Sequence, residues 1–273
     1  MKKYLFLLAT AVMSLVGCTD QQFVNETITD STSHVSEREF NALIEQARWG
    51  DGQAFLRLAD CYRDGKGVGK DLVGVLGMLA QAEEYGAINN MPDYLREMPE
   101  GTDLRIIADA FDKFENHRIE EAMSMSEQLI AKGCAEGYTV QGTMAIESGD
   151  TLAGLRLMRQ AASRGSTLAA LLLCLPECRG GDTPDVERLT AMSDMIPFAN
   201  IFLAKIYTGG YNEDLADEHL AAYYFLRADK NACLDKRGAR WLLSYYENGG
   251  DLPLSELDIK RLKVIARRPK DRL

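Results

Sequence analysis

The fold is decided by residues 53–86, which read QAFLRLADCYRDGKGVGKDLVGVLGMLAQAEEYG. In the first half, Ala54, Leu58 and Tyr62 follow one another at intervals of four residues, so they share one face of a helix. A second helical face begins after Asp71 and runs to Gly86. The stretch therefore predicts two helices joined by the glycine-rich turn DGKGVGKD.

The same arrangement recurs at residues 199–232. There Ala199, Leu203 and Tyr207 repeat the first-helix spacing, and a second helical face follows Asp217. The two units differ by one residue in the connecting turn. A recurring pair of helices predicts a stack of hairpins, because one hairpin cannot bury its apolar face alone. The positions expected to hold the hairpins together are Ala54, Leu58, Ala59, Tyr62, Gly65, Gly67, Asp71, Ala82, Gly86, Ala199, Leu203, Ala204, Tyr207, Gly210, Asp217, Ala221, Tyr224 and Ala228.

Weaker copies of the pattern lie at residues 103–133, 154–165 and 238–249. Thr167–Leu175 is expected to pair with a second helix at Asp185–Met195. Helical spacing thus dominates the chain past residue 37.

The pattern resembles Sel1-like repeats, which are relatives of the tetratricopeptide repeat. The matching residues in the first unit are Ala54, Leu58, Ala59, Tyr62, Gly65, Gly67, Val68, Asp71, Ala82 and Gly86. Val75, Met78 and Glu83 depart from it, at an alanine, a tryptophan and a second alanine position. The resemblance implies an all-α, right-handed α-solenoid of five or six helix pairs over residues 37–273. It also implies scaffolding of protein complexes and no catalysis.

The N-terminus, MKKYLFLLATAVMSLVGC, has the form of an export signal. Lys2 and Lys3 precede an uncharged run, Tyr4–Val16, which is too short to cross a bilayer. Residues 15–18, Leu-Val-Gly-Cys, resemble the lipobox of bacterial lipoproteins. By that resemblance residues 1–17 are removed and Cys18 carries the lipid, which anchors the chain to a membrane. The alternative is an ordinary signal peptide with an accidental cysteine.

Residues 18–36 are rich in Ser, Thr, Asn, Asp and Gln, and are expected to be a flexible tether between the lipid and the folded domain. The lipoprotein resemblance places the protein in the bacterial cell envelope. Thr19 after the cysteine favours the outer membrane, while the side of the membrane stays open. Whether the tether is glycosylated also stays open.

The charge of the chain argues against nucleic-acid binding. The formal net charge is −10, and removing residues 1–17 takes away two lysines and no acid, which moves it to −12. Binding to phosphate backbones without sequence preference requires clustered lysine and arginine.

The turn DGKGVGKD is not expected to bind a nucleotide. With Gly69-Lys70 as the G-K pair of a phosphate-binding loop, the required glycine and hydroxyl positions are Asp64 and Asp71. A dinucleotide fingerprint that starts at Gly65 needs glycine at Lys70 and a preceding strand. The turn is instead expected to link two helices, with Asp71 as the cap of the second.

Metal and catalytic motifs are also not expected. His34, His117 and His219 are far apart in the sequence, and Cys174 and Cys178 form one pair where tetrahedral zinc needs two. No cofactor is therefore predicted. The mature chain has five cysteines besides Cys18, and we expect core thiols rather than a disulfide, with Cys174–Cys178 as the pair nearest in sequence.

The C-terminal segment is expected to close the stack as a capping helix over residues 255–267. Ser255 and Asp258 have the spacing of a capping box. The cations of this segment are Lys260, Arg261, Lys263, Arg267, Arg268, Lys270 and Arg272. We expect a solvated helix with cations near its C-terminus, and the alternative is a docking patch for an anionic surface.

These features predict a membrane-anchored scaffold or adaptor that binds another envelope protein through the concave face of the solenoid. The residues that contact the partner cannot be named from the repeats, because the repeat positions are structural. One alternative is an envelope-polymer binding module or enzyme, for which Trp49 and Trp241 are the residues to inspect. The other is a structural subunit of an envelope assembly.

Overall fold

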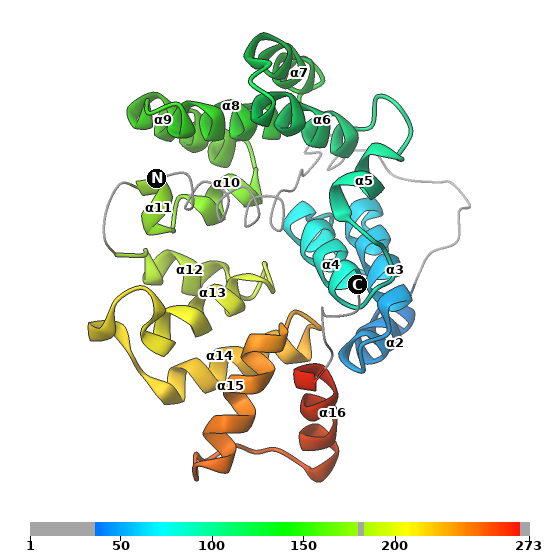
Figure 1. Ribbon diagram of the computed structural model, residues 1–273, viewed down its shortest axis with the longest axis vertical. Helices are drawn as coiled ribbons and strands as arrows, with labels where there is room; N and C mark the ends of the chain where they lie inside the picture. Colours follow the sequence, from blue (N-terminus) through cyan, green and yellow to red (C-terminus); the bar gives the residue numbers. More distant parts are fainter. Residues whose placement is uncertain (1–35, 180–182, 268–273) are drawn as a thin grey trace.

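The computed structural model describes residues 36–179 and 183–267, and all its regular elements in these ranges are helices (Figure 1). The signal segment, Cys18 and the tether up to residue 35 lie outside the described residues, as do Arg268, Lys270 and Arg272. The helices of the first half are α2 Glu37–Arg48, α3 Gly52–Asp64, α4 Leu72–Glu84, α5 Met91–Arg96, α6 Asp103–Glu115, α7 Ile119–Ala131, α8 Glu136–Glu147 and α9 Thr151–Ser163. Those of the second half are α10 Thr167–Leu172, α11 Pro176–Arg179, α12 Val186–Met192, α13 Ala199–Lys205, η2 Ile206–Gly210, η3 Glu213–Leu215, α14 Glu218–Lys230, α15 Lys236–Glu247 and α16 Glu256–Arg267.

Consecutive helices pack as hairpins along most of the described chain. The pairs with the most extensive contacts are α3/α4, α6/α7, α8/α9, α13/α14 and α15/α16. Small residues at the crossings let the backbones approach: a methyl group at Gly142 or Gly154 would crowd the partner helix of the α8/α9 pair. The expected all-α solenoid of stacked hairpins is therefore confirmed.

The middle of the stack departs from the expected pairing. α10 packs mainly against α9, α4 and α8, whereas α12 packs mainly against α13. The predicted hairpin of Thr167–Leu175 with Asp185–Met195 is wrong, because the chain turns at Leu173 and starts the short helix α11 at Pro176. Proline suits the first turn of a helix, where its missing N–H leaves no bond unmade.

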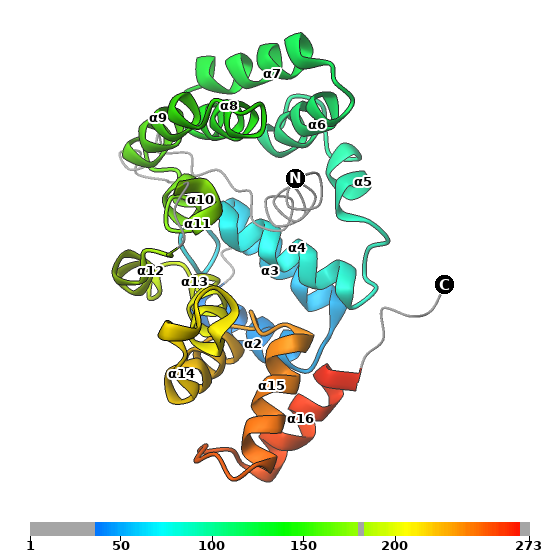
Figure 2. The ribbon, with the colours of Figure 1, turned by 60° about the vertical axis from the view of Figure 1, so that its left-hand side comes forward.

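The stack closes on itself, so that its first and last helices meet (Figures 1 and 2). Asp229 of α14 receives a guanidinium from each end of the chain: Arg48 of α2 at 3.0 Å and Arg261 of α16 at 2.6 Å. Arg261 and Asp229 are buried. Arg261 was expected among the solvated cations of the C-terminal helix, and that expectation is wrong because its charge is paired inside this closure.

Helix α4 lies inside the ring rather than on its rim. Its sequence is apolar on all sides, and residues from Leu72 to Leu79 are all buried. The Phe198 ring packs so closely on Gly77 that a methyl group there would overlap it. Thr167 of α10 also donates a hydrogen bond to Asp71 at 3.1 Å. The first hairpin therefore occupies the interior that an open solenoid would offer as a concave groove.

The two best-matched units share their turn chemistry. The Asp71 N–H donates to the Tyr62 carbonyl at 3.1 Å, and the Asp217 N–H donates to the Tyr207 carbonyl at 2.8 Å. Asp71 accepts from the N–H groups of Val73 and Gly74 at the start of α4. In the same way, Asp217 caps α14. Each aspartate thus supplies acceptors to free amides of a helix start.

The first helix of the second unit ends differently from that of the first unit. In the first unit the left-handed residue after α3 is Gly65, with φ of 72°. In the second unit the last turn widens into the π-helix η2, and the left-handed residue is Gly209 rather than the expected Gly210. Gly209 follows Tyr207 by two residues, whereas Gly65 follows Tyr62 by three, so the extra residue lies in the loop that leads to Asp217 and contains the short helix η3.

The apolar repeat positions lie in the core as their spacing implies. The buried members of the set are Ala54, Leu58, Ala59, Tyr62, Ala82, Ala199, Leu203, Ala204, Ala221, Tyr224 and Ala228. Tyr207 is half-buried and stacks on Tyr224, with ring centroids 5.7 Å apart. The expectation of core thiols holds for Cys61, Cys174, Cys178 and Cys233 and is wrong for Cys134, which is disulfide-bonded.

Candidate functional site

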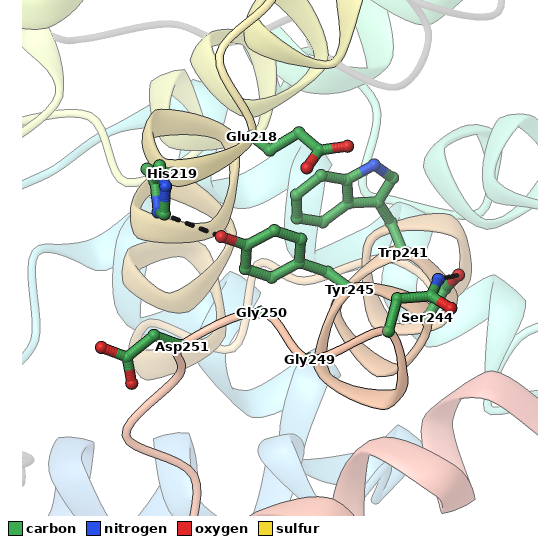
Figure 3. Close-up of a pocket in the computed structure, with 9 residues that line it drawn as sticks. Glu218, His219, Trp241, Ser244, Tyr245, Gly249, Gly250 and Asp251 are labelled. Carbon is green, nitrogen blue, oxygen red and sulfur yellow. Dashed lines mark hydrogen bonds between the residues drawn. The ribbon is translucent and has the colours of Figure 1, made fainter.

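An open pocket of about 440 Å³ lies between α14, α15 and the loop that follows α15 (Figure 3). Its lining residues are Glu218, His219, Trp241, Ser244, Tyr245, Asn248, Gly249, Gly250 and Asp251. We call it the α14–α15 pocket. It combines aromatic rings with hydroxyl, amide and carboxylate groups, which is a combination typical of binding sites.

Helix α15 supplies the aromatic part of this lining. Asp235 caps the helix by accepting from the Gly238 N–H at 2.7 Å, which fixes where the helix begins. Trp241 and Tyr245 are four residues apart and therefore neighbours on one face. Their rings are nearly parallel, with centroids 5.2 Å apart, and the Phe225 ring of α14 packs against Trp241 at a tilt of 40°, with centroids 5.4 Å apart.

Two further contacts fix the Tyr245 ring. Its hydroxyl is hydrogen-bonded to His219 Nδ1 at 3.0 Å, as Figure 3 shows. The backbone of Gly250 lies against the ring, and a methyl group at this position would overlap it. Gly249 adopts φ of 88°, which glycine reaches without strain. The aromatic wall of the pocket is therefore held in place from α14, α15 and the loop.

The charge of the pocket is negative. Glu218 and Asp251 are exposed, and in Figure 3 their carboxylates lie on different sides of the aromatic pair. Among the residues that the structure describes, no lysine or arginine lines the pocket. Within residues 36–179 and 183–267, neither carboxylate forms an ion pair.

An exposed apolar face lies next to this pocket on α14. Leu220 is 37% exposed, Tyr223 is 51% exposed, and Met195, in the loop between α12 and α13, is 74% exposed. Arg227 joins them, because it pairs with Asp194 and lies over the Tyr223 ring at 5.7 Å. We call Leu220, Tyr223, Arg227 and Met195 the α14 outer face.

The glycine-rich turn contributes to a different pocket, of about 510 Å³, between α3, α4 and residues 98–104. Arg63 and Lys70 line it. Arg63 is paired with Asp60 at 2.7 Å and with Asp64 at 2.8 Å. Lys66 pairs with Asp64 at 3.0 Å. Carboxylates of the turn thus compensate its cations, which agrees with a structural role.

A carboxyl group is buried where α8 meets the starts of α4 and α10. Glu136 of α8 has no exposed surface, and neither of its oxygens reaches hydrogen-bond geometry with a described residue. Burial raises the pKa of Glu136 to about 8, although the nearby Ser166 and Thr139 hydroxyls offset part of this effect. Asp71 adds a smaller like-charge repulsion. Because Glu136 is sealed from solvent, it cannot meet a substrate as an acid or base.

The sequence identified only part of the α14–α15 pocket. Trp241 lines it, whereas Trp49 is 37% exposed at the end of α2 and does not. His219 is exposed and forms the hydrogen bond to Tyr245. Tyr245, Glu218 and Asp251 were not identified. The spacing of Trp241, Ser244, Tyr245 and Asn248 on one helical face was the signal that could have found the pocket.

Among the described residues, no group of three or more histidine, cysteine, aspartate or glutamate side chains is placed to hold a metal ion. The described helices also include none that is long and apolar enough to span a bilayer.

No protein-family model matches this sequence, and no curated protein matches it either. Two solved structures are similar in fold. One is a Sel1 repeat protein from Oxalobacter formigenes, with 17% identity and a TM-score of 0.44 over 87% of this chain and 93% of that chain. The other is a protective antigen present in uropathogenic Escherichia coli strains that displays an SLR fold, with 16% identity and a TM-score of 0.40 over 83% of this chain and 47% of that chain.

Proposed function

We propose that this protein is a lipid-anchored adaptor of the bacterial cell envelope, which binds another protein through the α14 outer face. The anchor is Cys18, which the lipobox-like residues 15–18 mark for lipidation. The adaptor works without catalysis: the solenoid presents a surface, and the tether of residues 18–36 sets its reach from the membrane.

The observation that supports this function is the α14 outer face itself. Met195, Tyr223 and Arg227 belong to the residue types that are enriched in protein interfaces. Three large apolar side chains gathered on one exposed face, around a charged pair, are typical of a docking surface. The first hairpin fills the interior of the ring, so we place the partner on the outside rather than in a concave groove.

Site-specific crosslinking tests the docking face. A photoreactive amino acid replaces Tyr223 or Met195 in the full chain, and Leu257 of α16, which is also exposed, provides the control position. We expect one discrete protein adduct from both test positions and none from the control. An identical adduct pattern at Leu257, or no adduct at Tyr223 and Met195, contradicts the proposal. When the complex is diluted before irradiation, an adduct that still forms indicates a permanent subunit, whereas loss of the adduct indicates an exchangeable adaptor.

Metabolic labelling tests the anchor. We expect radioactive palmitate to label the wild-type chain and to be absent from the Cys18→Ser variant, which should leave the membrane fraction. A soluble wild-type chain with an unmodified Cys18 would exclude the anchor without affecting the docking face.

Binding of an envelope glycan is the second candidate, because Trp241 lines an open pocket instead of being packed away. Aromatic rings with hydroxyl, amide and carboxylate neighbours can hold a sugar. Sedimentation of the full chain with purified peptidoglycan tests this function. Retention that the Trp241→Ala variant abolishes would support it, and retention that is unchanged in that variant would exclude this pocket as the glycan site.

A further inference from the structure

We propose that the α14–α15 pocket receives a cationic side chain, arginine or lysine, from the protein that docks on the α14 outer face. This inference rests on the proposed function and adds the chemistry of the partner to it. It concerns an aromatic and acidic cavity whose ligand the repeat pattern does not indicate.

The aromatic wall is suited to a cation. Trp241 and Tyr245 present a nearly parallel pair of rings, and the face of an aromatic ring attracts a cation through its quadrupole. A planar guanidinium can in addition stack on such a ring. Because the Tyr245 hydroxyl is tied to His219 and its ring rests against Gly250, the wall needs little reordering when a ligand enters.

The carboxylates give the pocket its preference for positive charge. Glu218 and Asp251 lie on different sides of the aromatic pair, and no cation of the pocket lining neutralises them. Elsewhere in the described chain, cations are commonly paired: Arg48, Arg63 and Arg261 each have carboxylate partners. A pocket with two carboxylates and no cation in its lining is therefore complementary to a basic side chain.

The position of the pocket connects it with the docking face. Glu218 and His219 of the pocket immediately precede Leu220 of the α14 outer face. A partner segment that crosses the outer face along α14 reaches the pocket at the N-terminal end of this helix. The net charge of −10 further favours a basic partner.

A sugar is the competing ligand, and charge separates the two. A neutral glycan gains nothing from two carboxylates that lack a cation, whereas arginine and lysine do. Binding that requires positive charge on the probe therefore supports the proposal, and binding that ignores it does not.

Fluorescence of Trp241 tests the pocket directly. The chain has two tryptophans, so the Trp49→Phe variant leaves Trp241 as the sole reporter. The full chain in detergent is titrated with N-acetyl-arginine amide, with the neutral isostere N-acetyl-citrulline amide, and with tri-N-acetylglucosamine. We expect a saturable change with the arginine probe and at least roughly 10-fold weaker binding of the citrulline probe.

Variants of the pocket carboxylates test whether the arginine probe binds in the α14–α15 pocket. We expect Glu218→Gln and Asp251→Asn each to weaken the arginine probe by roughly 2- to 5-fold, as for a partly exposed ion pair. Glu187→Gln, an exposed carboxylate of α12 outside the pocket, should leave it unchanged. Thermal unfolding of each variant shows that the fold is intact. Higher salt should also weaken the binding.

Three results would overturn the inference: no saturable response to arginine, an equal response to citrulline, or a response to the glycan alone. Crosslinking from Tyr223 distinguishes a wrong assignment of the pocket's ligand from a wrong assignment of the docking face. If the discrete adduct at Tyr223 persists while the arginine probe does not bind, the adaptor function stands and the pocket chemistry is wrong. If arginine binds and the adduct is absent, the docking face is wrong.

Discussion

Two hairpins of this protein share one sequence pattern and have opposite surroundings. In α4, the third and sixth residues after the capping Asp71 are Gly74 and Gly77, and the Tyr62 and Phe198 rings pack on them. In α14, the corresponding residues after Asp217 are Leu220 and Tyr223, and both are exposed. One face of the same repeat unit thus forms core in the first hairpin and surface in the second. The difference teaches that residues between the repeat positions decide what a hairpin packs against.

The capping aspartates show the same contrast. Asp71 is buried, accepts from two amides and from Thr167, and its pKa is raised because burial outweighs these hydrogen bonds. Asp217 is exposed and accepts from the Leu220 N–H. Identical local chemistry therefore lies in a low-dielectric environment in one hairpin and in water in the other.

The largest expected effect is a loss of stability with rising pH. It comes from Glu136, which is buried beside the start of α4 in the first hairpin. Glu136 has a folded-state pKa of about 8 against an ordinary value of 4.5. Between these values the unfolded chain has released its proton and the folded chain has not, so stability falls as pH rises from 4.5 to 8. The full loss is about 5 kcal/mol. Urea unfolding of the full chain across this range measures it.

The Glu136→Gln variant should remove most of this pH dependence and unfold at higher urea concentration than wild type at pH 8. Glu147→Gln is the comparison variant: burial and the nearby Glu115 raise the pKa of Glu147 to about 7, so this variant should remove a smaller part of the fall in stability, between pH 4.5 and 7. If the fall in stability with pH persists in Glu136→Gln and disappears in Glu147→Gln, Glu147 and not Glu136 is its source, and the prediction is wrong.

The next largest effect concerns Gly77, the glycine of α4 against which the Phe198 ring packs. Gly77→Ala places a methyl group inside the Phe198 ring, and we expect a loss of about 2–3 kcal/mol from overpacking, despite the better helix propensity of alanine. Tyr223→Ala, at the corresponding position of α14, should change stability by less than about 0.5 kcal/mol, because Tyr223 is exposed. Similar losses for the two variants would show that the two faces are not in opposite surroundings.

The sequence predicted what depends on neighbours along the chain. The hairpins, the Asp71 and Asp217 caps, and the Ser255–Asp258 capping box, in which the Asp258 N–H donates to Ser255 and Asp258 accepts in return, follow from residues a few positions apart. Each involves one helix end, so no knowledge of tertiary packing is needed.

The closure of the ring could not be predicted in this way. The Arg48–Asp229 pair joins residues 181 positions apart, and no repeat spacing indicates it. The buried Glu136 interacts with Ser166 and Asp71, which cap α10 and α4, so its environment depends on packing between distant parts of the chain. One local signal was available: α4 is apolar all round, which predicts a helix covered on every side. In the candidate site, Trp241 could be identified by its residue type, but its neighbours His219 and Asp251 could not.

The capping aspartates provide the third test. Asp71→Ala should cost about 2–3 kcal/mol, because two amides and the Thr167 hydroxyl lose their acceptor in a buried place. Asp217→Ala should cost about 1 kcal/mol, the ordinary value for an exposed cap whose amide can turn to water. Chemical denaturation of the two variants gives both numbers. Equal losses would mean that burial adds nothing to the Asp71 cap.

The smallest effect concerns the residue that ends the second helix of each hairpin. It is Gly86 after α4, with φ of 73°, and Ala232 after α14, with φ of 56°. No heavy atom lies within 4 Å of a methyl group added at Gly86, so Gly86→Ala measures the backbone strain alone, and we expect a loss of about 1 kcal/mol. Ala232→Gly relieves the same strain but loses a buried methyl group, so its gain should be smaller. Thermal unfolding of both variants measures the difference. A stabilised Gly86→Ala variant would show that Gly86 does not hold its left-handed conformation in solution. The statement that both hairpins end their second helix in the same way would then be wrong.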